Sequence, residues 1–180
     1  MRWLAKLIYH KILGWKVVGF SDFDSVKKAV IIAAPHTHWL DFPIGILLRS
    51  VLGVKTNFVG KSSLFKFPIG WIFRALGGAP VQRHQNSNQV EAIAKLFHDR
   101  DMFRMAMSPE GTRKKVDKWR TGFYYIAKAA NVPIVMITLD FENKQNKISE
   151  PFYPTDDKEA DFKFMHQFYE GVKGKIPEYS

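Results

Sequence analysis

The sequence of 180 residues contains no cysteine. This absence excludes disulfide bonds, thiolate metal ligands and a cysteine nucleophile, and it is compatible with a reducing cytosol. The N-terminal segment has no uncharged run near the roughly 20 residues that a membrane-spanning helix needs, because Lys6, Lys11 and Lys16 interrupt it. A signal peptide would also require a longer apolar core and a small-residue cleavage site.

Acidic residues are scarce relative to basic ones, with 17 Asp and Glu against 27 Lys and Arg, a net charge of +10 and a pI of about 9.7. Such a field attracts polyanions, whether nucleic acid, an anionic membrane surface or a phosphorylated substrate. The hydrophobic content of 46% excludes a disordered chain. Together with the charge, the aromatic content of 14% favours a membrane interface, where amphipathic aromatic rings settle.

Residues 1–20 predict an amphipathic helix, because apolar residues recur at three- and four-residue spacing opposite basic ones. The apolar positions of this stretch are Trp3, Leu4, Leu7, Ile8, Ile12 and Trp15. A basic amphipathic helix with tryptophans suits the plane of the membrane interface. An ordinary helix packed on the domain would show the same pattern, so both roles remain open.

Residues 21–180 predict one α/β domain with a mixed, mostly parallel sheet covered by helices. Strand-like segments at 29–34, 55–60, 79–83, 103–107 and 132–139 alternate with helical ones, and 147–153, limited by Pro151 and Pro154, predicts an edge strand. The predicted helices are 42–52, 64–76, 86–99, 121–130 and 156–172. The segment 64–76 is apolar nearly all round, which indicates a helix that is buried or faces lipid.

The stretch PHTHWLDF at 35–42 connects the first of these strands to a helix. Pro43 suits the first turn of that helix, and Asp41 stands where an N-cap residue belongs. His36 precedes Asp41 by five residues, and an imidazole beside a carboxylate can act as a general-base pair. The pattern alone is equally that of a turn histidine followed by a helix cap.

A second polar turn, SPEGTR at 108–113, follows the strand 103–107. Gly111, Thr112 and Arg113 together predict an anion-binding nest of backbone N–H groups, a hydroxyl and a guanidinium. Glu110 would repel a phosphate, so we expect it to accept a hydrogen bond from a substrate hydroxyl or to hold Arg83 or Arg113. Arg83 follows a Gly-Gly turn and carries a five-donor fork suited to phosphate.

Four blocks in order make the sequence resemble the glycerolipid (lysophospholipid) acyltransferases typified by 1-acylglycerol-3-phosphate acyltransferase. The blocks are H-x4-D from His36 to Asp41, G-x4-R from Gly78 to Arg83, PEGTR at 109–113 and VPI at 132–134. The resemblance implies acyl transfer from acyl-CoA or acyl carrier protein to an alcohol, without a covalent intermediate, a metal or another cofactor. It also implies a peripheral or interfacial enzyme on the cytoplasmic face of the membrane.

By position, the resemblance makes His36 the base and Asp41 its orienting partner. The implied substrate-binding residues, which would hold a phosphorylated lyso-lipid or similar acceptor, are Lys61, Arg83, Glu110, Gly111, Thr112 and Arg113. The sequence departs from the family where Pro35 and His38 replace the usual Asn and Ser, and in the charged loop 114–118.

Two other functions fit parts of the sequence. His36, His38 and Asp41 approach the H-x-H-x-D-H spacing of zinc-dependent hydrolases, but no histidine follows Asp41 directly. The histidines downstream have no paired spacing; they are His84, His98 and His166. A zinc-dependent hydrolase would also leave the PEGTR block unexplained. A nucleic-acid-binding module would fit the net charge, but the lysines are dispersed and no recognition motif is present; we therefore expect no nucleic-acid partner.

Overall fold

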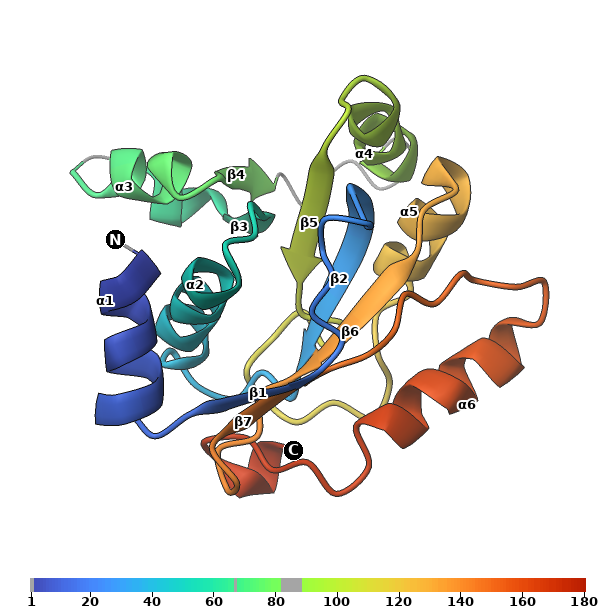
Figure 1. Cartoon of the computed structure of the whole chain (residues 1–180). Helices are drawn as coiled ribbons and strands as arrows, with labels where there is room; N and C mark the ends of the chain where they lie inside the picture. The colour runs from blue at the N-terminus through green and yellow to red at the C-terminus, as the bar shows by residue number, and fades with distance from the viewer. Residues whose placement is uncertain (1, 67, 82–88) are drawn as a thin grey trace.

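The computed structural model describes residues 2–66, 68–81 and 89–180, and these form a sheet sandwiched between two layers of helices (Figure 1). Within the described residues the sheet has seven strands in the order β1-β7-β6-β2-β5-β3-β4, parallel except for the antiparallel pair β6–β7. The strands are β1 (Lys16–Gly19), β2 (Lys28–Ala34), β3 (Asn57–Lys61), β4 (Gly78–Val81), β5 (Phe103–Met107), β6 (Ile134–Thr138) and β7 (Gln145–Ile148). The predicted fold class, a mixed but mostly parallel α/β sheet, is therefore confirmed.

Helices cover both faces of the sheet. The helical elements are α1 (Arg2–Lys6) continuing as the π-helix η1 (Leu7–Ile12), α2 (Asp41–Leu52), the 3₁₀ turn η2 (Ser62–Phe65), α3 (Gly70–Ala75), α4 (Gln89–His98), α5 (Gly122–Ala130), α6 (Lys158–Phe168) and the 3₁₀ turn η3 (Pro177–Tyr179). α1, η1 and α2 pack on one face, and α4, α5 and α6 on the other. η2 and α3 lie beside the edge strand β4.

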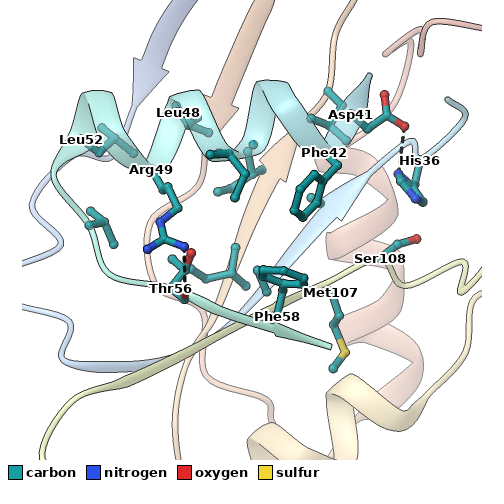
Figure 2. Close-up of a pocket in the computed structure, with 18 of the residues that line it drawn as sticks. His36, Asp41, Phe42, Leu48, Arg49, Leu52, Thr56, Phe58, Met107 and Ser108 are labelled. Carbon is teal, nitrogen blue, oxygen red and sulfur yellow. Dashed lines mark hydrogen bonds and ion pairs between the residues drawn. The ribbon is translucent and has the colours of Figure 1, made fainter. Parts of the chain in front are cut away.

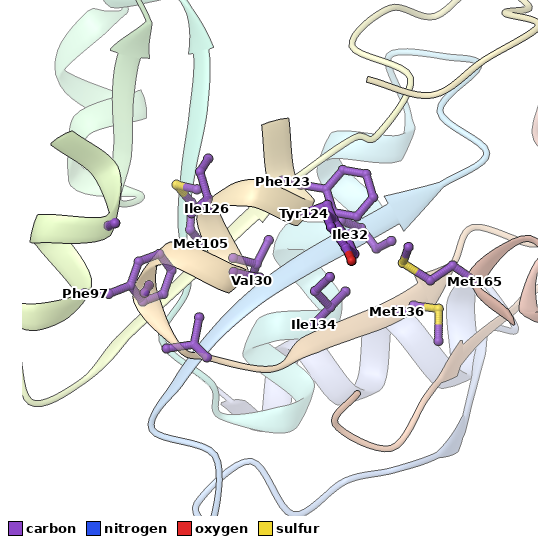
Figure 3. Close-up of a cluster of buried hydrophobic side chains, with 14 of the residues drawn as sticks. Val30, Ile32, Phe97, Met105, Phe123, Tyr124, Ile126, Ile134, Met136 and Met165 are labelled. Atoms are coloured by element: carbon purple, nitrogen blue, oxygen red, sulfur yellow. The ribbon is translucent and has the colours of Figure 1, made fainter. Parts of the chain in front are cut away.

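The central strand β2 feeds both cores, because successive residues of a strand point to opposite faces. Val30 and Ile32 pack under α4, α5 and α6, in the cluster drawn in Figure 3. Ile31 packs with Ile44 and Leu48 of α2 on the other face. A strand buried on both faces reads as a continuous apolar run, which is why β2 could be predicted from the sequence.

The N-terminal prediction was wrong in its length, since the helix expected over residues 1–20 ends at Ile12. Gly14 then turns the chain at φ 72°, and residues Lys16–Gly19 form β1, paired in parallel with β7. This pairing also corrects the edge strand expected at 147–153: β7 spans Gln145–Ile148 and is interior, because β1 takes the edge. Backbone partners on β7, distant in the sequence (Lys16 pairs with Gln145), outweigh a local helical pattern.

The segment 64–76 is not one buried helix. It divides into η2 and α3, and Gly70 begins α3 against the carbonyl group of Phe65, where any Cβ atom would clash. Ile69, Trp71 and Ile72 remain exposed. The burial alternative therefore fails for these side chains.

Candidate active site

The turn that follows β2 brings His36 and Asp41 together, as the H-x4-D spacing predicts. The His36 Nδ1 atom lies 2.8 Å from the Asp41 Oδ2 atom (Figure 2). The Asp41 side chain is almost fully buried, at 2% exposed, whereas the His36 side chain is 25% exposed. A buried carboxylate thus holds an imidazole that substrate can reach.

Asp41 does not cap α2 as expected, because it is the first helical residue and its carboxylate points back along the chain. The N-cap position is Leu40, without a side-chain cap. The Asp41 Oδ2 atom instead accepts hydrogen bonds from the backbone N–H groups of Thr37 and His38, each at 2.9 Å. The carboxylate therefore fixes the shape of the turn as well as the orientation of the His36 ring.

The contact with Asp41 also determines which nitrogen of His36 faces the substrate. A carboxylate accepts a hydrogen bond, so the proton of the neutral ring belongs on Nδ1 and the lone pair on Nε2. An imidazole in this tautomer can take a proton from a hydroxyl group while the carboxylate stabilises the imidazolium that forms. The arrangement is therefore competent for general-base chemistry.

Glu110 joins the two predicted turns. Its Oε2 atom accepts hydrogen bonds from the backbone N–H of His36 at 2.8 Å and from the Ser108 hydroxyl at 3.0 Å. Burial raises the pKa of Glu110, while these hydrogen bonds and nearby His36 oppose the rise. The structure thus gives Glu110 partners other than the arginine or substrate hydroxyl expected from the sequence.

The two turns meet because β2 and β5 are parallel neighbours at the centre of the sheet. Their carboxyl ends lie at the same edge, which is where open α/β sheets bind ligands. Ser108 begins the second turn and lies near His36 in Figure 2. Both turns contribute to the lining of one cavity, through His36 and Asp41 from the first and Ser108 from the second.

Gly111 has the backbone geometry that the predicted anion nest requires, with φ at 66°. Its backbone also lies close to Arg120, since a Cβ atom there would come within 2.6 Å of Arg120 Nε. The backbone N–H of Arg120 donates a hydrogen bond to the backbone carbonyl of Pro109 at 2.8 Å. Nothing in the sequence indicated that Arg120 lies beside Gly111, because Arg120 ends a charged loop without a recognisable motif.

The structure gives fewer contacts for the other predicted binding residues. Arg113 is exposed, and the Thr112 hydroxyl accepts a hydrogen bond from the N–H of Lys114 at 3.3 Å. Lys61 ends β3, but its side chain is outside the described part of the structure, as is the whole of Arg83. His38 uses Nδ1 to accept the N–H of Leu40 at 3.2 Å.

An apolar cavity of about 220 Å³ extends from His36 between α2 and the sheet (Figure 2). Its lining includes Phe42, Gly45, Leu48, Leu52, Phe58, Ala33, Ala106 and Ile137. Arg49 also lines it and donates to the carbonyl groups of Thr56, at 3.3 Å, and of Leu76. Burial lowers the pKa of Arg49. The sequence patterns did not predict this cavity. The feature that could have indicated it is the small size of Ala33, Gly45 and Ala106, which line it.

In the described residues, no three His, Asp or Glu side chains come together in a way that could hold a metal ion. Within the same ranges, no helix combines the length and the apolar character needed to cross a bilayer.

Comparisons with known proteins identify the family. The model of the Acyltransferase family matches residues 16–140, and no curated protein sequence matches the chain. The fold is similar to that of the 1-acyl-sn-glycerophosphate (LPA) acyltransferase PlsC from Thermotoga maritima, with a TM-score of 0.63 and 22% identity over 93% of this chain and 74% of that one. Because the family model spans well over half of the sequence, the chain belongs to the Acyltransferase family.

Proposed function

We propose that this protein moves a fatty acyl group from a thioester to the hydroxyl of a lysophospholipid or glycerol-phosphate-type acceptor. One observation carries the proposal: the His36–Asp41 pair is part of the lining of an apolar cavity of about 220 Å³. A base beside an apolar cavity suits a reaction that joins a hydroxyl to a long hydrocarbon chain. The membership of the Acyltransferase family supports the reaction class.

The proposed reaction needs one base and no covalent enzyme intermediate. His36 Nε2 removes the proton of the acceptor hydroxyl as its oxygen attacks the thioester carbonyl carbon. The tetrahedral intermediate then collapses, the carbon–sulfur bond breaks, and the thiolate takes the proton from the imidazolium. Asp41 stabilises the imidazolium between these two steps. No redox step or metal is required by this sequence of transfers.

The apolar cavity is proposed to hold the acyl chain. Its lining residues on α2 run from Asp41 to Leu52, the full length of that helix, or roughly 17 Å at the rise of an α-helix. With C–C bonds of about 1.5 Å in a zigzag, this length suits about a dozen carbons. Arg49 near the C-terminal end of α2 would place a polar group beside the chain there.

The acceptor phosphate is proposed to contact the cationic side chains of Arg83 and Arg113, with Lys61 as a further contact. Gly111 and Thr112 would border the glycerol portion. Support comes from the left-handed Gly111, which allows backbone N–H groups to face a ligand. The donor would be acyl-CoA or acyl carrier protein, and the enzyme would work at the cytoplasmic face of the membrane, bound peripherally or in the interface.

The test of function is transfer of a labelled acyl group to a panel of lyso-lipid and glycerol-phosphate acceptors. Activity that survives a strong chelator would exclude the zinc-dependent hydrolase, and indifference to added DNA would exclude a nucleic-acid module. If no alcohol in the panel is acylated while the thioester is simply hydrolysed, the proposed function is wrong.

The acyl cavity has its own test at Gly45, where a side chain would meet open space. We expect Gly45→Phe to fill the cavity and to shift the preferred acyl chain to shorter lengths without loss of the fold. Gly122 begins α5 and also has open space around it, so Gly122→Phe is the matched control. An unchanged chain-length profile for Gly45→Phe would contradict the assignment of the cavity.

A further inference from the structure

The C-terminal segment returns to the edge of the sheet that carries the proposed base. α6 ends at Phe168, and a few residues later the carbonyl of Lys173 accepts a hydrogen bond from the backbone N–H of Phe141 at 2.9 Å. Phe141 follows β6, which is a parallel neighbour of β2, so both strands end at this edge. In Figure 1 the C-terminus lies near β7, at the lower edge of the sheet, toward which the arrow of β5 points.

Thr37 is the residue of the catalytic turn that receives this segment. It lies between His36 and His38 and is only 2% exposed. Its Oγ1 atom accepts a hydrogen bond from the backbone N–H of Ile176 at 3.1 Å. Its own backbone N–H donates to the Asp41 Oδ2 atom at 2.9 Å. One buried residue therefore joins the C-terminal segment to the carboxylate that orients the base.

Gly174 packs against the same side chain. A Cβ atom on Gly174 would lie 2.6 Å from the Oγ1 atom and 2.7 Å from the Cγ2 atom of Thr37, closer than van der Waals contact allows. Gly174 is buried and does not have the positive φ that strains other residues. The β-branched side chain of Thr37 has few rotamers with which to move aside. The segment and the turn therefore fit together at a position where only glycine leaves enough room.

The C-terminal segment is itself anchored. The Gly174 N–H donates to the Ser180 Oγ atom at 2.8 Å, across the 3₁₀ turn η3. The Lys173 Nζ atom lies 2.7 Å from the Glu142 carboxylate. The segment lies beyond residues 16–140, which the Acyltransferase family model matches. Its contact with the catalytic turn is therefore a feature of this chain's own tertiary structure.

We propose that Thr37 is a positioning residue for acyl transfer, and that residues 173–176 act through it to hold His36 and Asp41 in their reactive arrangement. The inference rests on the proposed acyl transfer and adds the support that the base requires. The hydrogen bond from Ile176 and the close packing of Gly174 fix the Thr37 side chain, and the Thr37 backbone in turn fixes the carboxylate.

The effect reaches the base through the Asp41 Oδ2 atom. This atom accepts the backbone N–H groups of Thr37 and His38 and lies 2.8 Å from the Nδ1 atom of His36. A shift of Thr37 changes the hydrogen bonds that direct the carboxylate, and the carboxylate directs the imidazole. Because a displacement of a reacting group by about 1 Å costs on the order of 100-fold in rate, a small shift has a measurable effect on turnover.

The experiment compares variants on both sides of this contact. Thr37→Val keeps the shape of the side chain but removes the acceptor, and Thr37→Ser retains a hydroxyl group. Gly174→Ala places a Cβ atom against Thr37. The matched controls are Thr121→Val, at a threonine before α5 that makes no side-chain cap, and Gly122→Ala, at a glycine with open space around it.

Two measurements are made on each variant, after thermal denaturation has verified that it folds. Steady-state acyl transfer gives kcat and the KM for donor and acceptor. The nitrogen chemical shifts of the His36 imidazole, assigned by comparison with His36→Ala, report which ring nitrogen carries the proton and how it is hydrogen-bonded. The second measurement needs no substrate, so it tests the positioning of the ring independently of the reaction.

We expect Thr37→Val and Gly174→Ala to lower kcat by about 10-fold or more with KM values within about 2-fold, because positioning affects the chemical step. In both variants the Nδ1 chemical shift of His36 should move, since the contact with Asp41 is altered. Thr37→Ser should recover most of the lost kcat, and the two controls should match the wild type. In a Thr37→Ala background, Gly174→Ala should cost less than about 3-fold, because the side chain that it meets is gone.

A folded Thr37→Val variant with unchanged kcat, or with unchanged nitrogen shifts for His36, would overturn the inference. A rise in KM without a fall in kcat would assign Thr37 to substrate binding and would overturn it as well. Equal losses from Gly174→Ala in the wild-type and Thr37→Ala backgrounds would show that the segment does not act through Thr37. Absent transfer in the wild type would refute the proposed function, and the nitrogen shifts of the variants would still decide whether Thr37 positions the ring.

Discussion

Glu110 offers the sharpest test of how the two turns work together. Substitution by alanine removes the acceptor of the His36 backbone N–H and of the Ser108 hydroxyl, which lie 2.8 and 3.0 Å from Oε2. Because Glu110 is only 8% exposed, water cannot freely replace the lost partner. An unsatisfied buried donor costs about 1–3 kcal/mol in the free energy of unfolding.

That loss should lower the melting temperature by roughly 2–4 °C per kcal/mol for a domain of this size. The larger effect is expected in catalysis, because the Glu110 hydrogen bond fixes the backbone of the base itself. A displacement of a reacting group by about 1 Å costs on the order of 100-fold in rate. We therefore expect Glu110→Ala to lower kcat by about 10- to 100-fold while the KM values for donor and acceptor change little.

The assay measures kcat and KM for each substrate in Glu110→Ala, in Glu110→Gln and in the control Glu150→Ala, which removes an exposed carboxylate. Glutamine retains one oxygen acceptor, so it should recover part of the lost kcat. A selective rise in the KM for the acceptor with unchanged kcat would refute the reasoning. It would instead favour the role first expected from the sequence, in which Glu110 contacts the substrate.

Three more predictions concern the same site. His36→Ala should lower turnover by about two to four orders of magnitude, the usual contribution of a general base, and His38→Ala should cost less; near-normal transfer by His36→Ala in a steady-state assay would contradict the assignment. Arg83→Ala should raise the KM for the acceptor more than that for the donor, and equal rises would argue against phosphate binding. Burial raises the pKa of Glu110 above its ordinary 4.5, so the folded state favours the protonated carboxyl group. The stabilisation from this preference is fully present below pH 4.5 and is lost as pH rises through the raised pKa. Glu110→Gln does not titrate, so its melting temperature should rise relative to that of the wild type as pH increases from 4.5 through the raised pKa. A difference in melting temperature that stays constant with pH would be evidence against the pKa shift.

Local patterns failed at the sheet edges and in the polar turns. Lys16–Gly19 looked helical in the sequence but joins the sheet, because β7 offers unpaired backbone groups that must find partners. Asp41 looked like a helix cap, yet its carboxylate faces backwards to Thr37 and His38. Both outcomes depend on competition between possible hydrogen-bond partners, which a local pattern does not resolve.

Segment 64–76 shows a different limit. Its apolar composition predicted a helix either buried or facing lipid, and only the arrangement around β4 left Ile69, Trp71 and Ile72 exposed. The apolar cavity was likewise invisible beforehand, because it is bounded by α2, β2, β3 and β5 together. Empty space belongs to no single segment of the sequence.

The sequence by itself determined the central strand, the turn and the following helix, and it placed His36 and Asp41 within the same tight turn. The contact between the His36 ring and the Asp41 carboxylate was one of two arrangements compatible with that spacing, and the folded turn decided between them. It also identified the second turn at 108–113. Only the tertiary structure decided that Glu110 links the two turns, that α2 encloses a cavity beside the base, and that Trp3 and Trp71 face outwards. Neighbouring residues constrain one another through short-range sterics and hydrogen bonding, whereas distant segments meet only through the parallel pairing of strands and the packing of helices on the sheet.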